Sequence, residues 1–166
     1  MLDRIPPVLS RTAAVGSLVV LAVLTVSGCS RSSEPASRGA GSPRQIPAPP
    51  DVAAAPADAS VTATGLASKV IAPGASTRHP RPNSRVTVHY TGWTADGKMF
   101  DSSVVQEQPS TFGLDEVIPG WTQGVQMMVP GEKRRFWIPA ALAYEGVPDK
   151  PQGPLVFDIE LIRIDS

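Results

Sequence analysis

Hydrophobic and polar residues alternate along two segments of the chain. Residues 85–91 place Val86, Val88 and Tyr90 at every second position, and residues 155–164 repeat the same alternation. A period of two indicates a β-strand with one buried face and one solvated face. Both segments are therefore predicted to be strands of a half-buried sheet.

Other segments extend this predicted sheet. Residues 66–71 favour a first strand, and residues 135–138 favour another whose side chains point alternately to the two faces. A turn at residues 95–97 leads into residues 98–102. This last segment is expected to pair, as a hairpin, with the strand that precedes the turn.

One segment has helical spacing instead. Trp121, Val125 and Met128 fall at positions i, i+4 and i+7, which predicts a short helix with one apolar stripe. Pro130 and Gly131 are expected to end it. A short helix that covers the apolar face of an antiparallel sheet defines an α+β domain.

The first 28 residues have the features of an export signal. Arg4 and Arg11 give a positive start, and residues 13–26 form an uncharged apolar run, which is short for a spanning helix of about 20 residues. Small residues then precede Cys29, the only cysteine among 166 residues. This arrangement resembles a bacterial lipobox, in which Cys29 becomes the lipidated first residue of the mature protein. An ordinary secretory signal with a free thiol is the alternative.

Residues 29–60 are rich in Ser, Pro, Gly and Ala and have no apolar period. Such a composition buries too little surface to offset the entropy of ordering, so a disordered linker is predicted. One domain, residues 61–166, follows. More than one acyl chain on Cys29 would hold it at the bacterial cell envelope. Because Ser30 rather than Asp follows the cysteine, the expected location in a Gram-negative cell is the periplasmic side of the outer membrane.

Charge and side-chain chemistry narrow the classes of function. Fifteen basic residues balance fifteen acidic ones, so nothing indicates a nucleic-acid partner. His79 and His89 lack metal-ligand spacing, and no serine lies in a nucleophile elbow. The basic residues 133–135 are predicted to be an exposed strand edge. Recognition by apolar contact is therefore favoured.

Four separated sequence blocks carry a family resemblance. They read VTVHYTGW at residues 86–93, DGKMFDSS at 96–103, VIPGW at 117–121 and VFDIEL at 156–161. In this order they resemble the FKBP-type peptidyl-prolyl isomerases over residues 61–166. The resemblance implies an antiparallel, twisted β-sheet wrapping one short α-helix. It also implies isomerase activity on Xaa-Pro bonds of exported proteins, no metal or cofactor, and binding of proline-containing polypeptides and macrolide inhibitors.

The resemblance assigns roles to eight residues of this chain. Trp121 would form the floor under the proline ring, and its walls would be Tyr90, Phe100, Val117 and Phe157. The backbone N–H of Ile118 and the hydroxyl of Tyr144 would donate hydrogen bonds to the substrate. The carboxylate of Asp101 would lie beside the rotating bond. No second domain or dimerisation segment is visible, so a monomer is expected.

Simpler interpretations of the same residues stay open. Tyr90 and Phe157 lie in predicted strands, where aromatic side chains usually belong to the core. Trp121 alone would anchor the helix on the sheet, and Asp101 alone would be a solvated hairpin residue or a cap. A module that holds proline segments without turnover is the alternative function. A purely structural lipoprotein is a third.

Two departures from the family pattern bear on specificity. Ser110 stands where many members have an aromatic residue, two positions before Phe112, and this opens one predicted wall of the pocket. The flap at residues 145–154 is short, and Asp149 and Lys150 stand where relatives carry apolar residues. The choice of peptide and the affinity for macrolides are therefore the properties least fixed by the resemblance.

Overall fold

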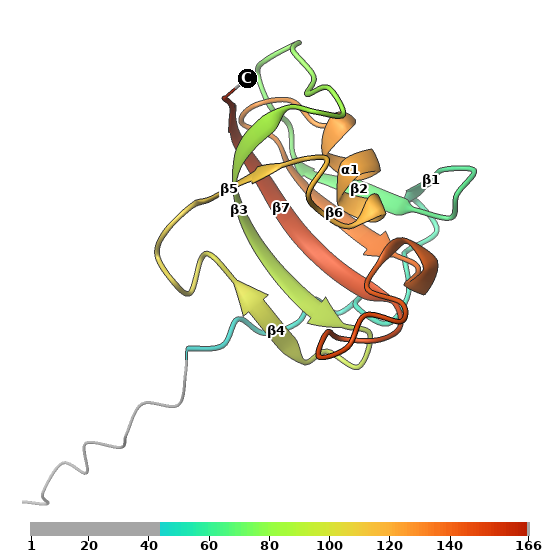
Figure 1. The fold of residues 1–166 in the computed structure, drawn as a ribbon. Helices are drawn as coiled ribbons and strands as arrows, with labels where there is room; N and C mark the ends of the chain where they lie inside the picture. Colours follow the sequence, from blue (N-terminus) through green and yellow to red (C-terminus); the bar gives the residue numbers. More distant parts are fainter. Residues whose placement is uncertain (1–43, 166) are drawn as a thin grey trace, which may run out of the picture. The chain divides into compact units, whose positions relative to one another are not determined.

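The computed structural model describes residues 44–165 (Figure 1). Within this range the chain forms seven strands, one α-helix and one 3-10 helix, as follows: β1 (Ser60–Val61), β2 (Ala67–Ala72), β3 (Arg85–Thr94), β4 (Met99–Ser102), β5 (Ser110–Gly113), α1 (Pro119–Gln126), β6 (Lys133–Ile138), η1 (Ala140–Leu142) and β7 (Leu155–Ile164). The α+β class predicted from the sequence is confirmed.

The strands form one antiparallel sheet in the order β1-β2-β6-β7-β3-β4. β5 pairs with the first part of β3, and β4 pairs with its last part. β3 and β7 pair along most of their length, from Val86 opposite Ile164 to Thr94 opposite Leu155. In Figure 1 the sheet curves around α1, which is the arrangement that the family resemblance implied.

The longest strands lie where the alternation predicted them. Residues 155–164 coincide with β7, and β3 continues three residues beyond the predicted end at Thr91. The turn before β4 places Gly97 at φ 86°. β1 and β5 were not predicted, because two and four residues are too short to show a period.

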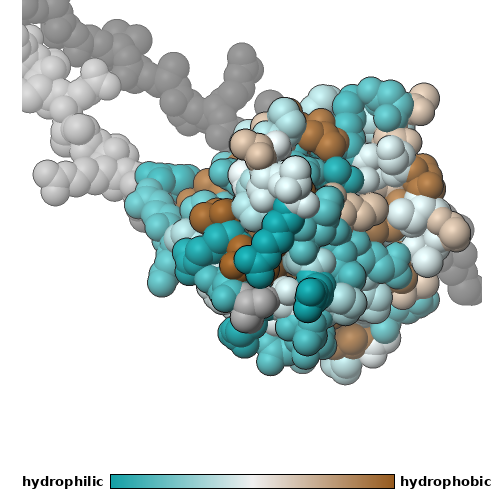
Figure 2. Space-filling view, turned by 90° about the horizontal axis from the view of Figure 1, so that it is seen from above, coloured by the Kyte–Doolittle hydropathy of each residue, from teal (hydrophilic) through white to brown (hydrophobic). Residues whose placement is uncertain are grey.

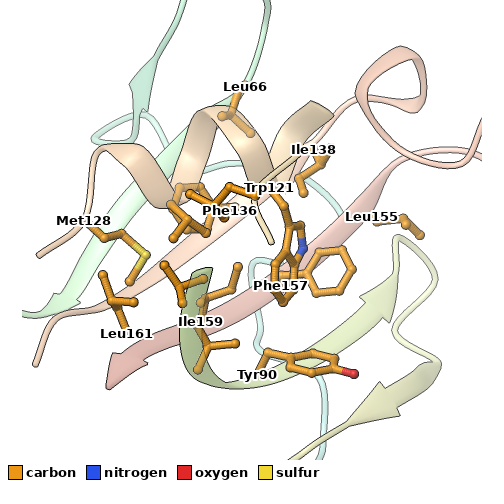
Figure 3. Close-up of a cluster of buried hydrophobic side chains, with 14 residues drawn as sticks. Leu66, Tyr90, Trp121, Met128, Phe136, Ile138, Leu155, Phe157, Ile159 and Leu161 are labelled. Carbon is orange, nitrogen blue, oxygen red and sulfur yellow. The ribbon is translucent and has the colours of Figure 1, made fainter. Parts of the chain in front are cut away.

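The inner face of the sheet packs against α1 to form the core (Figure 3). The side chains that are fully shielded from solvent are Leu66, Val86, Val88, Leu114, Val125, Met128, Leu155, Ile159 and Leu161. The predicted helical stripe is part of this core, with Trp121 only 5% exposed at its N-terminal end. Trp121 and Val125 thereby fix α1 on the sheet, whereas Met128, also buried, follows the helix, which ends at Gln126 before the predicted end at Pro130.

The outer face of the sheet is covered by residues 44–59, which we call the N-terminal strap. Its apolar side chains pack against a second cluster, formed by Ala67, Trp93, Trp137 and Val156. The indole N–H of Trp93 donates to the carbonyl oxygen of Ile46 at 3.0 Å, and that of Trp137 donates to the carbonyl oxygen of Asp51 at 2.8 Å. The strap is thus tied to the sheet through its backbone as well as its side chains.

The prediction of a disordered linker up to residue 60 is therefore wrong for the strap, and the folded domain begins before residue 61. The hydrophobic side chains of the strap larger than alanine or proline are Ile46 and Val52 alone, so its composition gave no sign of order. The two tryptophans of the outer face supply the apolar surface and the hydrogen-bond donors that the segment lacks.

The basic residues 133–135 are not an exposed strand edge, because β6 lies between β2 and β7. The Nε and Nη2 of Arg135 donate to the two carboxylate oxygens of Asp158 at 2.6 and 2.9 Å. Its Nη1 donates to Asp51 of the strap at 2.6 Å. Arg134 Nε donates to Glu132 at 2.6 Å. Two acids that are distant in sequence, Asp51 and Asp158, and the neighbouring Glu132 pair with this run and allow it to lie inside the sheet.

The surface of the domain is mixed. Figure 2 shows one face, where hydrophobic residues form small separate areas among hydrophilic ones. The large hydrophobic side chains that are exposed come from several different segments: Val61, Val70, Ile71, Val104 and Val147. Across residues 44–165, no helix combines the length and the apolar character that crossing a bilayer requires. The predicted signal peptide and Cys29 lie outside the described residues.

Candidate active site

A cavity of about 630 Å³ opens beside the N-terminus of α1. Its lining includes all eight residues to which the resemblance assigned a role: Tyr90, Phe100, Asp101, Val117, Ile118, Trp121, Tyr144 and Phe157. They come from β3, β4, the start of α1, the loop after η1 and β7. The structure thus brings together residues that are far apart in the chain, while their individual roles stay predictions.

The start of α1 presents Trp121 to the cavity. Pro119 occupies the first helical position, where its missing N–H costs nothing. The carbonyl of Ile118 accepts the N–H of Trp121 at 2.9 Å. A Cβ atom on Gly120 would lie 2.5 Å from Cγ2 of Ile138, so glycine is what allows the helix to start this close to β6. The sequence Ile-Pro-Gly-Trp therefore fixes the indole in place.

Three aromatic rings stand nearly perpendicular to the indole of Trp121. The centroid distances and interplanar angles are 5.2 Å and 82° for Tyr90, 5.4 Å and 89° for Phe157, and 5.7 Å and 89° for Phe112. Phe100 meets Phe157 edge-on at 5.5 Å and 89°. Edge-to-face contacts of this kind are a favoured geometry for aromatic pairs. Figure 3 shows Trp121, Tyr90 and Phe157 gathered in this way, which gives the cavity an apolar base and apolar sides.

Sequence analysis missed Phe112 as a lining residue. It lies in β5, whose four residues were too few to predict as a strand, so nothing indicated the direction of its side chain. The sequence assigned no role to the other additional lining residues, which are Glu116, Pro119, Ala143, Val147 and Lys150. Ser110 belongs to β5 opposite Val88, and it does not appear among the cavity-lining residues.

The polar groups of the cavity centre on Asp101. The hydroxyl of Tyr90 donates to its Oδ2 at 2.6 Å, and the amide of Gln106 approaches its Oδ1 at 3.4 Å. Burial, followed by the hydrogen bond to Asp101, raises the pKa of Tyr90 far above its ordinary value. Burial and the charge of Asp101 also raise the pKa of Tyr144. Both phenols are therefore protonated at neutral pH and able to donate hydrogen bonds.

The site also contains a backbone donor, the N–H of Ile118. Ile118 precedes α1 with φ −60° and ψ 149°, outside the helical region. Within residues 44–165 its N–H has no hydrogen-bond partner, and the residue lines the cavity. A donor of this kind suits a carbonyl oxygen of a bound peptide.

The flap after Tyr144 is organised by one side chain, that of Gln152. Its Nε2 lies 3.2, 2.8 and 2.9 Å from the carbonyl oxygens of Tyr144, Val147 and Lys150. Its Oε1 accepts the N–H of Gly146 at 3.2 Å. These contacts close the short flap on itself beside the cavity.

In the part of the chain that the structure describes, no group of three or more His, Cys, Asp or Glu side chains is placed to hold an ion. The cavity itself offers an apolar enclosure with hydrogen-bond donors and the carboxylates of Asp101 and Glu116. Such an enclosure suits a neutral peptide segment better than a charged cofactor.

The fold and this cavity define the class of protein. The sequence profile described as FKBP-type peptidyl-prolyl cis-trans isomerase matches residues 76–162, just over half of the chain. The chain belongs to this family.

Individual relatives agree with that assignment. The chain is 46% identical over 108 residues to the FKBP-type peptidyl-prolyl cis-trans isomerase FkpA of Aeromonas hydrophila, covering 63% of this chain but only 40% of that protein. It is 45% identical over 104 residues to FK506-binding protein 2 of Yarrowia lipolytica, covering 59% of this chain and 72% of the relative. A crystal structure of a peptidyl-prolyl cis-trans isomerase from Pseudomonas syringae pv. tomato superposes with a TM-score of 0.60 at 42% identity, covering 68% of this chain and 84% of that one.

Proposed function

We propose that this protein catalyses cis-trans isomerisation of Xaa-Pro bonds in proline-containing polypeptides. The observation that carries the proposal is a single cavity in which the indole of Trp121 is boxed by perpendicular aromatic rings. The carboxylate of Asp101 and the phenol of Tyr144 line the same cavity. Family membership and the similarity to named isomerases support the same activity.

The reaction requires no covalent intermediate, because its rate depends on the environment of the amide bond. Rotation about an amide bond costs about 18 to 20 kcal/mol because the planar amide loses resonance when it twists. The two Xaa-Pro isomers differ by only about 0.5 to 1 kcal/mol, yet they exchange in tens to hundreds of seconds. The twisted amide has less charge separation than the planar one, so a dry aromatic cavity raises the ground state relative to the transition state. Lowering the barrier by about 4 to 7 kcal/mol would accelerate exchange by roughly three to five orders of magnitude.

Each predicted residue has a part in this scheme. The proline ring rests on Trp121 between the aromatic walls, which exclude water from the rotating bond. The N–H of Ile118 and the hydroxyl of Tyr144 donate to substrate carbonyl oxygens. The carboxylate of Asp101, oriented by Tyr90, lies beside the bond as its charge distribution changes.

The activity is tested by following cis-to-trans exchange in a short Xaa-Pro peptide with the purified full chain. Tyr144→Phe is expected to lower kcat/KM about five- to tenfold, the effect of one lost hydrogen bond of about 1 kcal/mol. Asp101→Val is expected to lower it at least as much while the protein stays folded at the assay temperature, although the unfolding temperature falls because the hydroxyl of Tyr90 loses its acceptor. Asp58→Val is the matched control, because Asp58 is an exposed acid of the strap that lies outside the cavity and, among residues 44–165, forms an ion pair only with Lys69. Equal exchange rates with and without the protein would instead favour a module that binds proline segments without turnover.

The proposal extends to the location and ligands of the protein. We infer that Cys29 is lipidated and holds the domain at the bacterial cell envelope, where exported polypeptides are the substrates. The lipobox-like sequence supports this inference. Cys29→Ser should move the protein from the membrane fraction to the soluble fraction, and continued membrane association would rule out the lipid anchor. We also propose that a macrolide inhibitor competes with peptides for the cavity. The protein is proposed to act as a monomer.

A further inference from the structure

Three charged side chains line the cavity: Asp101, Glu116 and Lys150. The two acids are already engaged by the domain. Asp101 accepts the hydroxyl of Tyr90, and Glu116 accepts the N–H of Gly113 at 3.3 Å. Lys150 differs, since it makes no ion pair with any of residues 44–165. The cavity therefore has one cation at its mouth whose charge the described part of the domain does not neutralise.

The position of this cation is set by the flap. The carbonyl of Lys150 accepts from the Nε2 of Gln152 at 2.9 Å, and Asp149 before it has φ 60°, where the chain turns sharply. The Nζ of Lys150 lies 5.6 Å from the ring centroid of Tyr144, within the range of a cation–π contact. The ammonium group is thus held over the phenol that is proposed to contact the rotating bond.

The proposed function, on which this inference rests, places the proline ring on Trp121 and has the hydroxyl of Tyr144 donate to a substrate carbonyl oxygen. We take this carbonyl to be that of the residue before proline, whose side chain is attached to the adjacent carbon. With that carbonyl at Tyr144, Lys150 is the charged group nearest to this side chain. We propose that Lys150 makes the site select substrates with an acidic side chain, Glu or Asp, immediately before proline.

An acidic side chain before proline is favoured by its charge. Lys150 is exposed, so its attraction for a substrate carboxylate is that of a surface ion pair and is weakened by salt. A basic side chain before proline would meet like charge at the same place. A neutral side chain would be neither attracted nor repelled by the charge of Lys150, so glutamine is the reference for glutamate.

The experiment compares kcat/KM of the full chain for peptides that differ only in Glu-Pro, Gln-Pro or Lys-Pro. At low ionic strength the Glu-to-Gln ratio is expected to be about two to five, the effect of one surface ion pair, and it should approach one in high salt. Lys150→Met should bring the ratio to about one, and Lys150→Glu should make Lys-Pro the preferred peptide. Lys98→Met is the matched control, because Lys98 is an exposed lysine that does not line the cavity, and it should preserve the ratio.

A ratio of one in the unmodified protein, a ratio insensitive to salt, or a ratio unchanged in Lys150→Met would each overturn the inference. Lack of turnover with every peptide would count against the proposed activity instead. In that case the affinities for the Glu-Pro and Gln-Pro peptides, measured by NMR titration, give the same comparison without catalysis. Equal affinities there would overturn the inference as well.

Discussion

The hydroxyl of Tyr90 donates a 2.6 Å hydrogen bond to Oδ2 of Asp101. The two residues lie on paired strands, β3 and β4, in a diagonal relationship, since Asp101 stands opposite Gly92. Tyr90 is 8% exposed and packs edge-on against Trp121. A core side chain thereby fixes the direction of the one carboxylate proposed to act on the substrate.

Tyr90→Phe tests this relationship. The substitution keeps the ring and removes the donor, so we expect kcat/KM to fall about tenfold because Asp101 loses its fixed orientation. The free energy of unfolding should fall by about 1.5 to 3 kcal/mol, as for a hydrogen bond to a charged group. Combining Tyr90→Phe with Asp101→Asn should cost less than the sum of the single changes. Strict additivity would show that the two residues act independently.

Alkaline titration offers a second test, because the chain contains only two tyrosines and both line the cavity. The pKa of each is raised, mainly by burial, in the folded protein. We therefore expect tyrosinate absorbance at 295 nm to stay low in the folded protein near pH 10, where the unfolded chain shows half-ionised tyrosine. A normal titration of either tyrosine in the folded state would contradict the burial of that phenol in the cavity.

The same shift determines how stability changes with pH. Because the folded-state pKa values lie above the unfolded values, the stabilisation is complete below about pH 10 and is lost as pH rises towards the folded pKa values. The free energy of unfolding should fall in that window by up to about 1.4 kcal/mol per pH unit for each tyrosine. Tyr144→Phe should make this fall less steep in urea titrations at pH 10 to 11.

The sequence pattern predicted those elements in which hydrophobic positions recur with a regular period over many residues. β3 and β7 show a period of two, and the α1 region shows a helical period, so both were located from the sequence. The cavity residues were found through the four sequence blocks, since no local pattern connects Asp101 with Tyr144. The roles of these residues are still untested.

The features that sequence analysis missed depend on distant partners. Phe112 became a wall only through pairing of β5 with β3. Arg135 seemed solvated until the fold placed Asp158 opposite it on β7. The strap looked like a spacer because its order depends on tryptophans from β3 and β6. A single sequence contains no direct signal for such contacts.

Removal of the N-terminal strap is expected to weaken the domain. A chain that begins at Val61 would expose Trp93 and Trp137 and lose one of the two acidic partners of Arg135. Because a fully buried apolar side chain contributes about 1.5 to 3 kcal/mol, and ordering the strap offsets part of this, we expect a loss of about 2 to 4 kcal/mol in urea unfolding. Tryptophan fluorescence should also shift to longer wavelength as the indoles become solvated.

A finer variant separates the contributions of the strap. Asp51→Asn removes one of the two charged partners of Arg135 but keeps the backbone carbonyl that accepts from Trp137. It should therefore cost less than the truncation and leave the fluorescence unchanged. If the truncated chain unfolds at the same urea concentration as the full chain, the strap contributes no net stability to the domain.

Gly92 is predicted to control the shape of the cavity. A Cβ atom there would lie 2.7 Å from Cζ of Phe100 and 2.7 Å from Cε1 of Phe157, both of which are cavity walls. Gly92→Ala should displace these rings, with a loss of stability of about 1 to 3 kcal/mol. The fall in kcat/KM should be larger than the loss of folded protein alone would cause. Gly124→Ala is the matched control, because its Cβ would meet Phe136 of the core at 2.8 Å, away from the cavity lining. Both variants should lose stability in urea unfolding, but Gly124→Ala should retain the kcat/KM of the folded protein. Equal retention of kcat/KM in both would show that the walls move without changing the site.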